Sequence, residues 1–209
     1  MPGRFDRFLD ALAAVRLSGN ACNQYSSAGA ERKANAIRGT NLRLYLEELS
    51  AIDPDTLLIG EAPSHRGGRL TGIAFVSETL LLAGACGVLG AARGYRKATA
   101  GPQLSTEASA TMVWSAIPAL HPLPILWNAF PFHPFQPGNA LSNRVPSREE
   151  LAIGRPFIEQ LLRLFPIRRA VAVGNQASRS LDILGIEHVK VRHPSMGGKN
   201  EFVAGVARL

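Results

Sequence analysis

The sequence of 209 residues has little cysteine, with only Cys22 and Cys86 present. The two thiols lie far apart and lack the close spacing of metal ligands, which excludes a disulfide-stapled scaffold and a metal site built from cysteines. Three of the histidines, His65, His121 and His133, stand in separate predicted loops. We therefore expect no metal ion.

Long apolar runs and phosphate-binding loops are also missing. The longest uncharged stretch, residues 79–92, is too short to span a bilayer and is rich in glycine and alanine. Arg4, Asp6 and Arg7 precede any apolar stretch, so no secretory signal peptide is expected. The paired glycines at 67–68 lack the spacing of a nucleotide-binding motif. We expect a cytoplasmic protein with no membrane association and no cofactor.

Negative charge is scarce, with 16 Asp and Glu against 23 Lys and Arg, giving a net charge of +7. This excess suits a polyanionic partner, and nucleic acid is the first candidate. The need for solubility alone would explain the same balance. The 46% of hydrophobic residues can bury a core, and the length predicts a single domain over residues 1–209.

Four short apolar segments have the pattern of buried strands, and segments with helical signals lie between them. The predicted strands are 56–59, 124–127, 170–174 and 188–191. The predicted helices are 5–15, 42–49, 75–89, 147–165 (in one piece, or with a second beginning near Pro156) and 175–184. Residues 20–34, 65–72 and 131–146 are predicted loops, and residues 91–123 are predicted to be irregular or to form a short hairpin. The alternation predicts an α/β fold, a three-layer α/β/α sandwich around a four-stranded parallel sheet.

Two local signals mark helix starts within this pattern. Ser147 and Glu150 have the spacing of a capping box, in which each side chain accepts a hydrogen bond from the other's backbone. Asn175 is expected to cap the helix over 175–184, which ends at Gly185.

Polar residues follow the ends of these strands, where open α/β sheets bind ligands. Glu61 can hold a water, Asn128 can read an imide edge, and His193 can donate to an oxygen that gains charge. Phe75 can stack on a flat ring. Each residue also has an ordinary structural explanation, because Glu61 and Asn128 suit turns and Phe75 suits a core.

Four motifs in order carry a resemblance to a known family. They are Gly60-Glu61-Ala62-Pro63, Thr71-Gly72-Ile73-Ala74-Phe75, Asn128-Ala129-Phe130-Pro131 and His193-Pro194-Ser195. Over roughly residues 56–200 the chain resembles the uracil-DNA glycosylase superfamily. Residues 137–139, 143–147 and 170–181 look like the branch of that superfamily that carries an iron–sulfur cluster.

The resemblance implies a hydrolase that flips uracil, or another deaminated base, out of DNA and leaves an abasic site. Phe75 would stack on the base and Asn128 would read its imide edge. His193 would stabilise the departing uracil anion. The backbone around Gly60 and Ala62 would complete the pocket, and the partner would be damaged DNA bound by a monomer.

The chain departs from the family pattern at two places. Where the cluster-bearing branch has four cysteines, only Cys22 remains, and Tyr25 and Phe132 stand where partners are expected. We therefore predict no cluster. Ala62 occupies the place where the best-known branch carries a water-positioning aspartate, so Glu61, which matches the acid of the cluster-bearing branch, is assigned to the water.

The resemblance also indicates DNA contacts around the pocket. After the His193 motif the family inserts a side chain into the gap left by the flipped base, and Met196 is the apolar residue at hand. Lys199 suits a phosphate. The remaining candidates for phosphate contact are Ser64, Arg66, Arg69 and Ser195, and the two arginines can equally be solvated loop charges. His65 is also assigned to DNA, because it matches the histidine that ends the first motif of the best-known branch.

Three functions fit these residues. The first is a DNA repair glycosylase that removes uracil, or another deaminated base, from DNA. The second is a binding protein that keeps the base pocket but has lost turnover, because Ala62 replaces the usual acid. The third is a hydrolase that acts on small nucleosides and binds DNA poorly.

Overall fold

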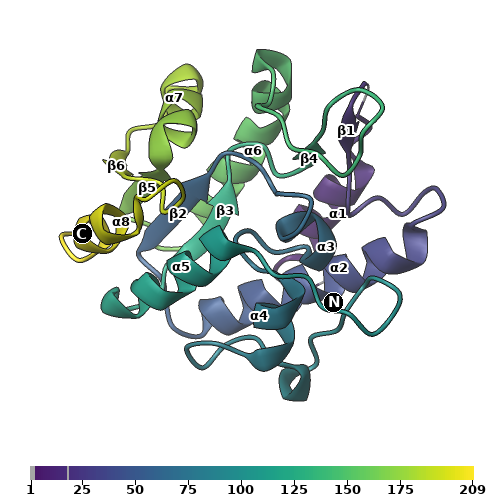
Figure 1. Cartoon of the computed structure of the whole chain (residues 1–209), viewed down its shortest axis with the longest axis horizontal. Coiled ribbons are helices and arrows are strands. Elements are labelled where there is room, and N and C mark those ends of the chain that lie inside the picture. Colours follow the sequence, from purple (N-terminus) through teal and green to yellow (C-terminus); the bar gives the residue numbers. More distant parts are fainter. Residues whose placement is uncertain (1–2, 18) are drawn as a thin grey trace.

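The computed structural model describes residues 3–17 and 19–209, and its centre is a four-stranded parallel sheet. The strands are β2 (Thr56–Gly60), β3 (Ile125–Asn128), β5 (Arg169–Val173) and β6 (Val189–Val191), in the order β3-β2-β5-β6. Helices flank the sheet (Figure 1). The predicted α/β architecture and all four predicted strands are confirmed.

The remaining elements surround this sheet. The α-helices are α1 (Asp6–Ala14), α2 (Arg32–Ser50), α3 (Gly68–Thr71), α4 (Glu78–Ala83), α5 (Ala108–Ala116), α6 (Arg148–Leu164), α7 (Gly174–Leu184) and α8 (Lys199–Val206). Short 3-10 turns occupy Ala91–Arg93 and Ile117–Ala119. Within the described residues, no helix has both the length and the apolar character that crossing a membrane requires.

The strands form where the sequence is continuously apolar. Leu57, Leu58 and Ile59 in β2 are completely buried, as expected for a strand covered on both faces. In the pairing of β2 with β3, Gly60 lies opposite Asn128. The pairing continues past the strand ends, because the Ala129 amide donates to the Gly60 carbonyl at 2.8 Å. The turns after β2 and β3 are thereby held side by side.

The predicted helix over 75–89 is wrong in extent, since α4 covers only Glu78–Ala83. Phe75 has a φ of 56°, which no α-helix accommodates, and Gly84 ends α4 with a φ of 81°. The predicted loop over 20–34 is also only partly correct. It contains β1 (Ala21–Cys22), which pairs with β4 (His133–Pro134) inside the predicted loop over 131–146. Helix α2 also begins within residues 20–34.

The prediction that residues 91–123 are irregular or form a short hairpin missed α5. This helix has no side-chain cap, and burial of Ala110, Val113 and Trp114 in its middle stabilises it. Its signal was therefore tertiary, as is usual for a short helix.

The two predicted helix starts had opposite outcomes. The capping box is confirmed, with the Glu150 amide donating to Ser147 Oγ at 3.2 Å and the Ser147 amide donating to Glu150 Oε2 at 2.8 Å. Helix α6 continues through Pro156 as one piece. Asn175 is not the cap of α7, because that helix begins one residue earlier, with Val173 in the cap position and no side-chain bond.

Candidate active site

A pocket of about 380 Å³ lies at the carboxyl ends of the parallel strands. This is the edge where open α/β sheets bind ligands, and the volume falls in the range of small-molecule sites. All six residues predicted for catalysis or base binding line it, namely Gly60, Glu61, Ala62, Phe75, Asn128 and His193. The sheet therefore brings together residues from the first and last motifs of the chain.

Gly60, Phe75 and Asn128 form one closely packed wall. A Cβ atom on Gly60 would lie 2.5 Å from Phe75 Cζ and 2.7 Å from Asn128 Oδ1, so only glycine fits there. The left-handed backbone of Phe75 is held by Trp114 of α5, whose Nε1–H donates to the Phe75 carbonyl at 2.9 Å. The aromatic ring and the amide are thus fixed beside each other before any ligand arrives.

His193 lies against α7 and has a defined tautomer. A Cβ on Gly174, whose φ is 89°, would lie 2.7 Å from His193 Cβ. The backbone N–H of Ser195 can only donate, and it donates to His193 Nδ1 at 3.1 Å. In the neutral ring the proton is therefore on Nε2, which is left to donate to a ligand. Burial, and then the positive charge of Arg192, lower the pKa of His193 and favour this neutral form.

The carboxyl group of Glu61 is partly buried without compensation. Its Oε1 atom is buried and accepts no hydrogen bond within the described chain. Burial raises the pKa of Glu61 to about 7, because removal from water disfavours the charged form. Such a group exchanges a proton near neutral pH, which a base acting on water requires.

Several residues that line the pocket were missed from sequence. They are Glu107, Ser109, Pro134, Asn143, Arg144, Asn175 and Gln176. Their spacing in the sequence predicted no role in a pocket. Asn143 and Arg144 were noted only as part of a resemblance to one branch, and Asn175 was assigned to a helix cap. The remaining residues had no predicted function. A capping role was expected for Asn175, and the absence of a cap bond leaves its side chain at the pocket.

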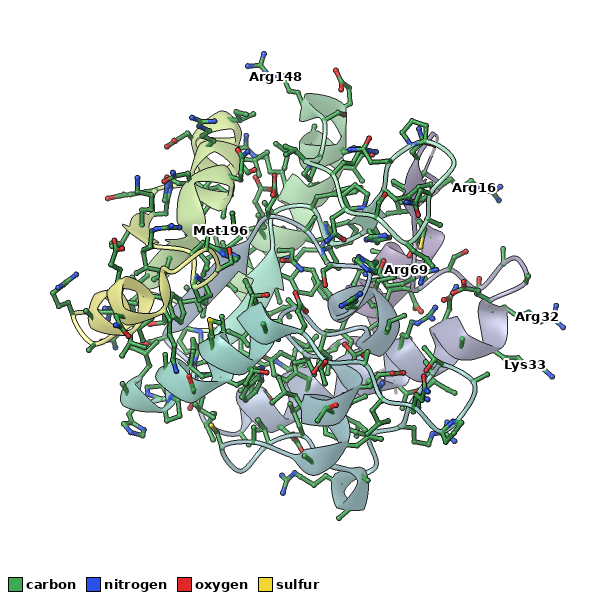
Figure 2. The ribbon with its side chains drawn as sticks, viewed as in Figure 1. Arg16, Arg32, Lys33, Arg69, Arg148 and Met196 are labelled. Atoms are coloured by element: carbon green, nitrogen blue, oxygen red, sulfur yellow. The ribbon has the colours of Figure 1, made fainter. Side chains whose placement is uncertain are left out.

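The predicted DNA-contact residues surround the pocket more loosely. Ser64 lines it. Met196, on the loop between β6 and α8, is 91% exposed, and Figure 2 shows it apart from Arg69 on α3. Arg69 is paired with Glu31 at 3.2 Å, which restrains its reach. Lys199 is exposed at the start of α8.

The other three predicted contacts differ in their freedom. Arg66 is exposed. The backbone N–H of His65 donates to Asn143 Oδ1 at 3.0 Å, so His65 ties the first motif to the loop before α6. Ser195 contacts His193 Nδ1 through Oγ at 2.7 Å, so its hydroxyl orients the ring.

Aromatic rings pack together around Tyr25 and Phe132, the two positions where the resemblance leads us to expect cluster ligands. Tyr25 packs edge-on against Phe132 at 6.4 Å between ring centroids, and Phe132 packs on Phe130 and Phe157. The Tyr25 hydroxyl donates to the Gly72 carbonyl at 2.9 Å. Over residues 3–17 and 19–209, no group of three or more His, Cys, Asp or Glu side chains is arranged to hold a metal ion.

Comparisons with known proteins agree with this geometry. The model of the family described as "Uracil DNA glycosylase superfamily" matches residues 47–204. A solved structure of wild-type SMUG2 from Pedobacter heparinus is similar with a TM-score of 0.63 at 14% identity, covering 100% of this chain and 97% of that chain. This likeness shows the fold alone. A search of the curated proteins gave no match.

Proposed function

The chain belongs to the uracil DNA glycosylase superfamily, a family of DNA N-glycosylases, and from this premise we propose that it removes uracil from DNA. The observation that carries the proposal is the meeting of Phe75, Asn128 and His193 around one pocket at the strand ends. A flipped uracil offers a flat ring, an imide edge and an oxygen that gains charge. Each of these three features has a partner in the pocket.

The imide edge of uracil carries both acceptors and a donor, and the planar amide of Asn128 offers both in return. Asn128 is only 5% exposed, so its hydrogen bonds form away from water. Phe75 stacks on the ring beside it. A buried amide disfavours bases that leave its hydrogen-bonding atoms unpaired. Asn128 and Phe75 together are therefore the source of base selectivity.

Cleavage breaks the bond between C1′ of the sugar and N1 of uracil, and the electron pair moves into the base. Negative charge collects on O2, where the Nε2–H of His193 stabilises it. The oxygen of a water forms the new bond to C1′. Glu61 accepts the proton of that water, a role matched to its pKa of about 7.

DNA is held outside the pocket by the exposed loops. Met196 enters the space left by the flipped base, and Lys199 and Arg66 contact phosphates.

The motifs at 137–139, 143–147 and 170–181 favour descent from the cluster-bearing branch. Tyr25, Phe130 and Phe132 replace the cluster with an aromatic core.

A uracil-containing oligonucleotide incubated with stoichiometric protein is expected to give free uracil and an alkali-labile abasic site. The same strand with thymine is the control. No release from uracil, xanthine or hypoxanthine strands would refute a glycosylase. Tight binding of the uracil strand without release would instead support the binding protein, which the absence of a carboxylate at Ala62 favours.

The single-turnover rate is expected to rise with pH and to level off above about pH 7. Glu61 must be ionised to accept a proton, and burial raises its pKa to about 7, so the rate is lost as the pH falls through that value. Glu61→Gln is expected to be slow and to lose this dependence. A pH series with both proteins measures it, and an unchanged curve in the variant would remove Glu61 from the water step.

A further inference from the structure

The pocket holds a second carboxylate that the steps above do not use. Glu107 lies directly before α5 and lines the pocket. Its Oε1 accepts a hydrogen bond from Ser109 Oγ at 3.0 Å. Its Oε2 lies over Gly67 so closely that a Cβ there would be 1.7 Å away. The loop between β2 and α3, residues 61–67, is called the first motif loop. It leaves room for the Glu107 carboxylate because position 67 is glycine.

The segment that carries Glu107 is anchored from behind. Glu78, at the start of α4, is 2% exposed, and its carboxylate accepts hydrogen bonds from the Ser105 amide at 2.9 Å and from Thr99 Oγ1. Ser105 Oγ accepts from the Glu78 amide at 3.2 Å, and the Thr79 amide donates to the Ser105 carbonyl at 3.2 Å. Glu107 therefore follows a segment that is held in place by hydrogen bonds to the start of α4.

The surroundings of the two carboxyl groups in the pocket differ. Glu61 has a buried oxygen without a hydrogen bond. Glu107 has a hydroxyl donor and lies at the start of a nine-residue helix, where the helix dipole stabilises negative charge. Carboxyl groups in contrasting environments take different roles in one site. Glu107 thus has a hydrogen-bond donor and a helix N-terminus beside its carboxylate, and Glu61 has neither at its buried oxygen.

We propose that Glu107 is a catalytic residue whose negative charge stabilises the positively charged sugar that forms as uracil leaves. It makes no covalent bond and takes no proton. It supplies the charge that Ala62 does not provide in the first motif. The inference rests on the proposed glycosylase function, because an oxocarbenium-like sugar arises only if the glycosidic bond is cleaved.

The test compares Glu107→Gln with wild type and with Glu47→Gln, an exposed carboxylate on α2. Glu107→Gln is expected to lower the single-turnover rate about tenfold or more, with unchanged affinity for uracil-DNA. Strands with a cationic pyrrolidine or a neutral tetrahydrofuran in place of the damaged nucleotide provide a second readout. Wild type is expected to prefer the cationic strand, and the variant is expected to lose that preference. Glu107→Asp is expected to restore part of it.

The outcomes separate this inference from the proposed function. Wild-type cleavage with a fully active Glu107→Gln variant overturns the inference alone. A slow variant that keeps the cationic preference also overturns it, since Glu107 would then only position the loop. A wild type that releases no base but prefers the cationic strand through Glu107 refutes the glycosylase and, with it, the catalytic role of Glu107, which would then only contact the cation. A wild type with neither property overturns both.

Discussion

His193→Ala is expected to slow uracil release in single turnover by about 10²–10³-fold, the usual effect of removing one donor to a developing oxyanion. The Ser195 amide fixes the tautomer so that Nε2–H is free for the base. Alanine removes this donor at the atom where charge collects, while contacts to the DNA backbone remain. Affinity for the uracil strand is therefore expected to change much less than the rate.

The matched control for this variant is His121→Ala, since His121 is exposed and lies outside the pocket. It is expected to cleave at the wild-type rate. Thermal melting of both variants checks that they are folded. A folded His193→Ala protein with full activity would show that the departing base is stabilised by another group.

Gly60→Ala is expected to lower the cleavage rate about 10²-fold, although it adds a single methyl group. The new Cβ would overlap Phe75 Cζ at 2.5 Å and Asn128 Oδ1 at 2.7 Å. Both side chains must then shift, and displacements of about 1 Å in a catalytic site cost this much in rate. The effect is measured as the single-turnover rate and the affinity for uracil-DNA. Both are expected to fall, because the base no longer fits.

Gly39→Ala provides the control for this second variant. Gly39 lies within α2, and a Cβ there would meet no atom within 4 Å. Alanine at this position is expected to leave the rate unchanged and to raise the free energy of unfolding by about 0.5–1 kcal/mol. Wild-type kinetics in Gly60→Ala would show that the pocket wall yields, and that the base is not read between Phe75 and Asn128.

The sheet could be predicted from the sequence because its strands are recorded locally. Runs such as Leu57–Ile59 are apolar without interruption, which is typical of a parallel strand covered on both faces. Capping of α6 was equally local, since Ser147 and Glu150 satisfy each other. The predicted helix boundaries were wrong where a backbone angle decided them. An example is Phe75, whose left-handed φ is maintained by the distant Trp114.

The candidate site divides in the same way. Glu61, Asn128 and His193 were found from sequence because each stands at the end of an apolar strand or within two residues beyond it, and strand ends of one parallel sheet share an edge. Glu107 was not found, since nothing near it in sequence shows that it faces Gly67. Its place depends on the packing of α4, α5 and the first motif loop.

The sequence by itself determined the sheet, the family and three of the residues that line the pocket, Phe75, Asn128 and His193, because hydrophobic runs and short motifs act over a few neighbouring positions. Only the tertiary structure decided the tautomer of His193, the raised pKa of Glu61 and the presence of a second carboxylate. Hydrogen bonding and exclusion of water set these properties, and both depend on residues that are distant in the chain and adjacent in space.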